Sequence, residues 1–309
     1  MSAAIVEDMK TRYALQLLLL SAVWGISFLM IRVAASAFPP IWVGMLRASF
    51  GALLLWAVLL IGGYKLPPRK LFLWLFLVAL TNNAIPFSFF AWGEQTVPSS
   101  TAAVLNATTP IWTLLLSLAV HSTRASLYTI LGVIVGFAGV AIVVYSRAST
   151  TGETTQRGNP VLGIIVIVLA ALGYAVATVI AKAKLQGLDP IGLAVTQLTL
   201  AALMLVPIAA VGPHPTAFHL APILAILVLG FAGSGIAYFL YYSLLAHIPA
   251  THVVAVTYLL PVWGIFWGLV AHEPIAPLVY VGVAIVIAGL VLMNRSVTPA
   301  PKLIEACAD

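Results

Sequence analysis

Residues 71–92 read LFLWLFLVALTNNAIPFSFFAW and contain no charged side chain. Because each helical residue rises about 1.5 Å, a helix of this length crosses the roughly 30 Å hydrocarbon core of a bilayer. Its centre is polar, since Thr81, Asn82 and Asn83 are consecutive and Pro86 follows them. Lipid tolerates such an interruption only where protein or a wet cavity satisfies the backbone. This segment therefore predicts a membrane helix that borders a site.

The rest of the chain has the same apolar character. Of its 309 residues, 62% are hydrophobic and 7% are charged, whereas about 25% of residues are charged in a soluble domain. A soluble fold of this size could not hide so much apolar surface from water. The sequence predicts an all-α integral membrane protein with ten transmembrane helices, at residues 13–34, 41–62, 71–92, 98–120, 126–146, 161–182, 190–211, 220–242, 249–271 and 276–293.

The basic residues indicate topology and not a nucleic-acid partner, because they are scattered singly between apolar runs. Basic residues are enriched in cytoplasmic loops. If the N-terminus is cytoplasmic, the opposite loops hold only Arg147 and Arg157. The cytoplasmic side then holds Lys10, Arg12, Lys65, Arg69, Lys70, Arg124, Lys182, Lys184, Arg295 and Lys302. We therefore expect cytoplasmic segments at residues 1–12 and 294–309, and a multi-pass protein of a bacterial-type cell inner membrane.

The two halves of the sequence resemble each other at an offset of about 150 residues. The matches are Pro40-Ile41 with Pro190-Ile191, Pro98 with Pro249, Pro110-Ile111-Trp112 with Pro261-Val262-Trp263, His121 with His272, and Gly132 and Gly139 with Gly282 and Gly289. They predict a first five-helix repeat at 13–146, a linker loop at 147–160 and a second repeat at 161–293. Because five is odd, the second repeat enters the membrane from the other side. Inverted repeats of this kind place a transport site near the midplane.

Polar or helix-breaking residues recur at matching depths in both halves. Span eight carries Gly233-Ser234-Gly235 where span three carries its polar triplet, and spans four and nine carry Pro110 and Pro261. A proline frees the carbonyl four residues earlier, which predicts unpaired backbone acceptors at Asn106 and Thr257. Such groups would bind a solute. The alternative interpretation is that these prolines only kink helices for packing.

Aromatic residues are predicted near the same depth, and an aromatic pocket with few charges suits a ligand with an apolar or aromatic body and a small polar head. Ordinary helix packing is the alternative for each ring. The candidate substrate-binding residues are Trp24, Asn82, Asn83, Phe87, Asn106, Trp112, Tyr174, Ser234, Tyr238, Tyr258 and Trp263.

Arg47 lies within span two, where the repeat places Gln197 in the other half. Its planar fork could bind a substrate carboxylate. It could instead pair with Glu94 at the end of span three, or extend toward the membrane surface. None of the eight acidic residues lies near the middle of a span. A facilitator, or coupling without a membrane acid, is therefore favoured.

Several motifs resemble those of the drug/metabolite transporter superfamily, EamA type: WGISF at 24–28, LR at 46–47, PSSTAA at 98–103 with Pro110 beyond it, and the Gly-rich last span. Within that superfamily the chain resembles the bacterial exporters of aromatic and other neutral amino acids, the YddG type. The resemblance implies a basket of helices around a central cavity, and export of such amino acids by alternating access. Export of drugs or other metabolites is the alternative within this class.

Other functional classes fit the sequence less well. An intramembrane enzyme needs an embedded catalytic set, and none is visible at suitable spacing. We expect no cofactor, no metal and no nucleic acid, with the lipid bilayer and a small-molecule substrate as partners. A non-transporting receptor or scaffold would carry a larger soluble domain. The Gly132-x-x-x-Gly136 and Gly264-x-x-x-Gly268 patterns suit close helix packing inside one chain, which favours a monomer over a homodimer.

Overall fold

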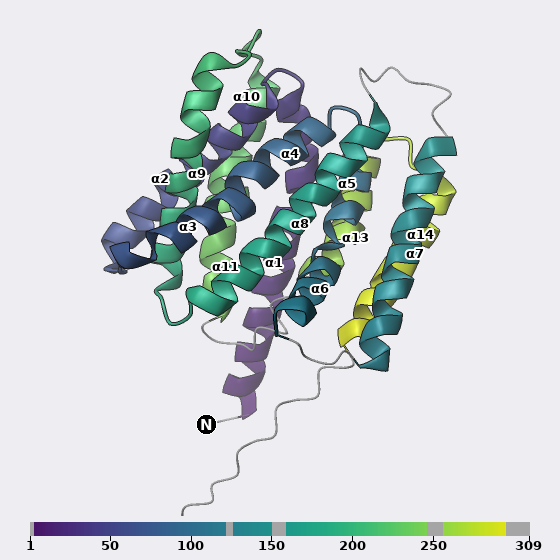
Figure 1. The fold of residues 1–309 in the computed structure, drawn as a ribbon, viewed down its shortest axis with the longest axis horizontal. Helices are drawn as coiled ribbons and strands as arrows, with labels where there is room; N and C mark the ends of the chain where they lie inside the picture. Colours follow the sequence, from purple (N-terminus) through teal and green to yellow (C-terminus); the bar gives the residue numbers. More distant parts are fainter. Residues whose placement is uncertain (1–2, 122–125, 150–158, 246–255, 295–309) are drawn as a thin grey trace, which may run out of the picture.

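The computed structural model describes residues 3–121, 126–149, 159–245 and 256–294, and these residues contain helices and connections but no strand (Figure 1). The first half comprises α1 (Ala3–Ala35), α2 (Pro40–Gly62), η1 (Arg69–Leu71), α3 (Phe72–Ala79), η2 (Leu80–Ala84), α4 (Ile85–Gly93), α5 (Ser99–Asn106), α6 (Thr109–His121) and α7 (Leu127–Ser149). The second half comprises α8 (Pro160–Lys184), α9 (Pro190–Val211), α10 (Leu220–Leu227), η3 (Val228–Ile236), α11 (Ala237–Leu245), α13 (Val256–Val270) and α14 (Pro277–Asn294).

Eight of the described helical stretches are long and apolar enough to cross a membrane. They are Arg12–Ala35, Pro40–Gly62, Arg69–Gly93, Ser99–Ala119, Leu127–Ser146, Pro160–Lys184, Pro190–Val211 and Leu220–Tyr241, and each coincides with a predicted span. Two shorter apolar helices, Leu259–Val270 and Pro277–Leu292, lie where spans nine and ten are predicted. The predicted start of span nine, near Pro249, falls outside the described residues.

The helix boundaries follow from local chemistry. Gly63 ends α2 in the left-handed conformation, at a φ of 65°, which only glycine adopts without strain. Asp189 caps α9, because its side chain accepts hydrogen bonds from the N–H groups of Ile191 and Gly192. Helix α1 begins at Ala3, earlier than the predicted residue 13, although its apolar stretch still begins at Arg12.

The predicted fourth span is broken into two helices. Helix α5 ends at Asn106 and α6 begins at Thr109, because Pro110 has no N–H group with which to continue the hydrogen-bond ladder. The freed carbonyl of Asn106 accepts a hydrogen bond from the Thr109 hydroxyl at 2.8 Å. The expectation that this carbonyl is unpaired was therefore wrong, since the side chain that follows it supplies a donor.

The packing of the helices is repeated between the two halves. Helix α1 packs on α13 as α8 packs on α5 and α6, and α10 and α11 contact α1 as α3 and α4 contact α8. Helix α2 packs on its own counterpart α9, and α7 packs on α14. Such reciprocal contacts are expected from an internal repeat.

Counterpart helices run in opposite directions. The start of α2 lies at the end of α9, where Trp42 Nε1 donates to the carbonyl of Pro213 at 3.1 Å. The end of α2 lies at the start of α9, where the Lys65 N–H donates to Asp189 Oδ2 at 3.1 Å. In Figure 1, α1 begins and α14 ends toward the same end of the bundle. This arrangement is the one that inverted repeats produce.

Helices α7 and α14 approach each other closely through glycines. A Cβ atom on Gly139 would lie 2.7 Å from the carbonyl oxygen of Gly282, and one on Gly289 would lie 2.5 Å from the backbone nitrogen of Gly136. In α13, a Cβ on Gly264 would meet the side chain of Ala103. These small residues therefore serve contacts within the chain.

We expect Gly139→Leu to lower the thermal unfolding temperature of the detergent-solubilised protein, because the added side chain forces α7 and α14 apart. Overpacking of this kind costs about 1–3 kcal/mol. The matched control is Ala141→Leu, which adds similar bulk to an exposed position on the same helix. Equal unfolding temperatures for the two variants would show that the close approach of α7 and α14 contributes little.

Candidate functional site

Two π-helical segments interrupt spans three and eight at matching positions. In span three, Pro86 cannot donate to the carbonyl of Asn82, and the Ile85 N–H bonds instead to the carbonyl of Leu80, five residues earlier. In span eight, the Ala237 N–H bonds to the carbonyl of Ala232, also five residues earlier. π-Helical turns occur frequently at functional sites. The predicted polar interruptions thus coincide with real irregularities of the backbone.

Polar side chains from both halves meet between these segments. Asn82 Nδ2 donates to Gln197 Oε1 at 3.0 Å and to the Tyr238 hydroxyl at 3.3 Å. Asn83 Nδ2 donates to the same hydroxyl at 2.9 Å, while Asn83 Oδ1 is buried without a hydrogen-bond partner. This cluster of Asn82, Asn83, Gln197 and Tyr238 is the polar cluster of the site.

Arg47 lies beside the polar cluster and is buried, with 7% of its surface exposed. Its Nε donates to Ser234 Oγ at 3.1 Å, and its guanidinium carbon lies 4.0 Å from the centre of the Phe87 ring. Tyr174 and Tyr238 both lie near enough to interact with this charge.

The structure excludes two interpretations of Arg47. The side chain is buried, so it does not extend toward the membrane surface. It also does not pair with Glu94, because neither carboxylate oxygen of Glu94 has a hydrogen-bond partner. Within the described residues, the guanidinium has one hydrogen bond and no carboxylate partner. A buried cation without a counter-ion strongly favours an anionic ligand.

The predicted candidates divide into those at this centre and those elsewhere. Asn82, Asn83, Phe87, Ser234 and Tyr238 lie at the centre with Arg47. Tyr174 stacks on Phe90, with ring centroids 6.1 Å apart.

The remaining candidates lie in separate contacts. The Trp24 ring lies 5.6 Å from that of Tyr241, and Trp263 Nε1 donates to Ser21 Oγ at 2.9 Å. Trp112 packs against Phe137 of α7, and its Nε1 donates to the hydroxyl of Thr108, which precedes α6. Asn106 Oδ1 is buried and unpartnered. The side chain of Tyr258 is outside the described part of the chain.

Gln197 is a site residue that the list of candidates omits. Its amide oxygen accepts from Asn82, and it occupies the position in α9 that corresponds to Arg47 in α2. The signal that could have found it was the internal repeat, since counterpart helices related by an in-plane axis bring equivalent positions to the same centre. The two halves thus contribute a cation and an amide at equivalent places.

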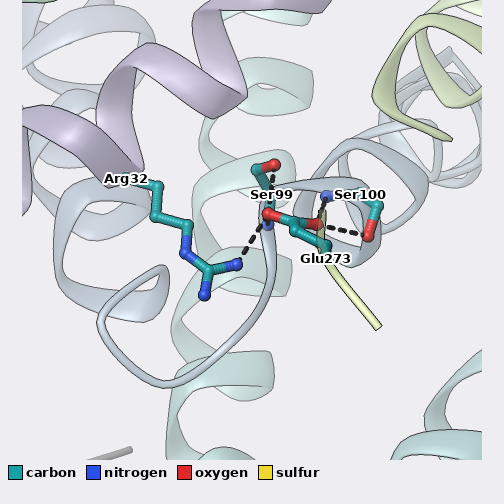
Figure 2. Close-up of polar contacts among 4 residues, drawn as sticks. All are labelled: Arg32, Ser99, Ser100 and Glu273. Atoms are coloured by element: carbon teal, nitrogen blue, oxygen red, sulfur yellow. Dashed lines mark hydrogen bonds and ion pairs between the residues drawn. The ribbon is translucent and has the colours of Figure 1, made fainter. Parts of the chain in front are cut away.

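A second polar cluster joins the two halves at one end of the bundle (Figure 2). Arg32 Nη1 pairs with Glu273 Oε1 at 2.6 Å. The N–H and hydroxyl of Ser99 donate to Oε1 at 3.1 and 2.6 Å, and those of Ser100 donate to Oε2 at 3.2 and 2.8 Å. Glu273 precedes α14 in the second half, whereas Arg32, Ser99 and Ser100 belong to the first. We call these four residues the end clamp.

Glu273 is held as a charged group. Burial alone would raise its pKa, but the hydrogen bonds from Ser99 and Ser100 and the charge of Arg32 outweigh burial and keep the pKa below the usual value. The carboxylate also lies at the N-terminus of α5, where the helix dipole favours negative charge. The end clamp is therefore a charged contact whose partners come from both repeats.

Comparison with known proteins agrees with this architecture. The EamA-like transporter family matches residues 11–145 and residues 161–295. The uncharacterized inner membrane transporter YedA of Escherichia coli (strain K12) is 26% identical over 275 residues, which cover 88% of this chain and 87% of YedA. The uncharacterized transporter YvbV of Bacillus subtilis (strain 168) is 24% identical over 288 residues, which cover 92% of each chain.

A solved crystal structure of a protein that is 17% identical has the same fold, with a TM-score of 0.65 and coverage of 91% of this chain and 96% of that chain. The family matches fall on the two halves whose counterpart helices run in opposite directions. The chain belongs to the EamA-like transporter family and is a multi-pass membrane transporter.

Proposed function

We propose that this protein exports small metabolites that carry a carboxylate, in particular aromatic or other neutral amino acids, across a bacterial inner membrane by alternating access. In this proposal the chain has ten spans, both termini are cytoplasmic, and the substrate binds between the π-helical segments. The name of YedA, an inner membrane transporter, supports the location. The opposite directions of counterpart helices support alternating access.

Arg47 is the observation that carries the substrate class. Burying a guanidinium without an anionic partner is unfavourable. Among the described residues, the direct contacts of Arg47 are neutral, because its Nε donates to the Ser234 hydroxyl and its guanidinium lies against the Phe87 ring. A carboxylate of the substrate would supply the anionic partner that Arg47 lacks. The planar guanidinium is well suited to donate two parallel hydrogen bonds to the two carboxylate oxygens.

The surroundings of Arg47 fit the rest of an amino acid. The unpartnered Asn83 Oδ1 can accept a hydrogen bond from an ammonium group. Phe87, Tyr174 and Tyr238 provide aromatic surface for an apolar or aromatic side chain. No second charge is needed for a zwitterion whose ammonium group contacts amide and hydroxyl oxygens.

Counterflow in proteoliposomes tests the proposal. Vesicles loaded with unlabelled phenylalanine should accumulate labelled phenylalanine, and phenethylamine, which lacks the carboxylate, should neither exchange nor compete. A panel of other neutral amino acids then defines the range. Absence of flux for every neutral amino acid, with correctly folded protein confirmed, would overturn the substrate assignment.

We expect Tyr238→Phe to weaken substrate binding by about tenfold, because the amide groups of Asn82 and Asn83 lose their shared acceptor and turn away from the site. Leaving a buried donor unpaired costs about 1–3 kcal/mol. Half-saturation of counterflow measures the effect. The control is Tyr280→Phe, on an exposed residue of α14, and equal behaviour of both variants would remove Tyr238 from the site.

A further inference from the structure

Glu94 is a buried carboxyl group that the proposed transport site does not use. It follows the last residue of α4, just beyond the membrane-spanning stretch that ends at Gly93. Only 3% of its surface is exposed, and neither carboxylate oxygen has a hydrogen-bond partner. Burying a carboxylate without well-formed hydrogen bonds is costly, because its charge loses hydration without compensation. The neutral, protonated form avoids this problem.

Glu273 provides the contrast within the same region. Its two oxygens accept from both serines and from Arg32, whereas Glu94 has none of these donors. The charge of Arg32 acts on both carboxyls, and Arg32 pairs with Glu273. One cation therefore pairs with one carboxylate, and a second negative charge at Glu94 would have no ion-pair partner among the described residues.

The charged groups around Glu94 act in opposing directions. Burial raises the pKa of Glu94 well above its usual value, and the negative charge of Glu273 raises it further. The positive charges of Arg32 and Arg47 lower it, together with a smaller contribution from the backbone of Arg32, but do not offset burial. Arg32 and Arg47 come from α1 and α2 of the first half, like Glu94, whereas Glu273 comes from the connection before α14 in the second half. A rearrangement of the halves therefore moves Glu273 relative to Glu94.

We propose that Glu94 is a proton-binding site that is neutral in this conformation and ionises when the end clamp opens and water reaches it. Closing this end of the bundle then takes up one proton onto the Glu94 carboxylate, and opening it releases that proton to the water. The protein accordingly carries a titratable carboxyl despite having no acidic residue at mid-span. The link to transport rests on the proposed function, but the protonation itself does not.

Infrared spectroscopy of the full-length protein in lipid measures the protonation without a substrate. The wild type at neutral pH should show the carbonyl band of a protonated carboxyl group, and this band should disappear as the pH rises. Glu94→Gln should lack the band, whereas Glu273→Gln should keep it. A band that is absent at neutral pH, or that persists in Glu94→Gln, would overturn the proposal.

Thermal unfolding supplies a second measurement. A carboxyl whose pKa is raised by folding contributes stability at low pH, and that contribution is lost as the pH rises through the folded pKa. Glu94→Gln should match the wild type below the usual glutamate pKa of 4.5 and should unfold at a progressively higher temperature than the wild type as the pH rises from there toward the folded pKa of Glu94. If Glu94→Gln does not fold, Glu94→Asp serves instead and should keep a protonated band with a different midpoint. Neither measurement depends on amino acid flux. The protonation of Glu94 and the export of amino acids can therefore be refuted independently.

Discussion

Arg47→Gln should abolish measurable counterflow of neutral amino acids while leaving the protein folded. Removing one member of a buried, hydrogen-bonded charge pair costs about 2–5 kcal/mol, which corresponds to a loss of roughly 30- to 3000-fold in affinity. In the substrate-free protein the same change removes a buried cation that has no carboxylate partner. Its thermal unfolding temperature should therefore stay the same or rise, which a purely structural arginine would not allow.

A double-mutant comparison shows whether Arg47 acts on the carboxylate itself. Phenylalanine amide, which lacks the carboxylate, should bind the wild type much more weakly than phenylalanine does. It should bind Arg47→Gln about as well as it binds the wild type, because the interaction is already missing. The control is Arg69→Gln, which changes an exposed arginine outside the site. If the loss of affinity caused by Arg47→Gln and the loss caused by replacing phenylalanine with its amide simply add, Arg47 does not contact the carboxylate directly.

The sequence was sufficient for the membrane fold because the physical constraints in lipid are few and strong. Long uncharged segments have to be helices that satisfy their own backbone, and eight of the described helical stretches are long enough to cross a membrane and coincide with predicted spans. The positions of Pro86 and of the Gly233-Ser234-Gly235 triplet indicated where the helices become irregular, and π-helical segments lie there. Proline and glycine act through the backbone, so their effect can be predicted from neighbouring residues alone.

Side-chain partners could not be predicted in this way, because they depend on how distant helices pack. Trp112 was predicted at the site by depth, but its ring faces Phe137 on α7. Depth alone does not say which face of a helix a residue occupies. Glu273 follows a helix-terminating histidine and gave no hint that it meets Ser99 and Ser100, more than 170 residues earlier. The predicted freed carbonyl of Asn106 was taken by a neighbouring hydroxyl instead.

Glu273→Ala should lower the thermal unfolding temperature by on the order of 5 °C, the largest loss expected from any single polar residue described here. The alanine leaves the donors of Ser99 and Ser100 without their acceptors and removes the partner of Arg32. Hydrogen bonds to charged groups contribute about 1.5–3 kcal/mol each. The Arg32 side chain is 34% exposed, so solvent screens that ion pair and most of the loss comes from the buried serines.

Asp189→Ala is the matched control, because Asp189 also caps a helix but accepts only from backbone N–H groups near a surface connection. Loss of such a cap costs about 1 kcal/mol, so the unfolding temperature should fall clearly less in Asp189→Ala than in Glu273→Ala.

The pH dependence of the unfolding temperature tests the charge of Glu273 separately. A glutamate whose folded pKa lies below its usual value of 4.5 contributes stability above that pH and loses it as the pH falls through the folded pKa. The difference in unfolding temperature between wild type and Glu273→Ala should therefore shrink in acid, and a difference that is constant with pH would mean that the carboxylate charge does not hold the two halves together.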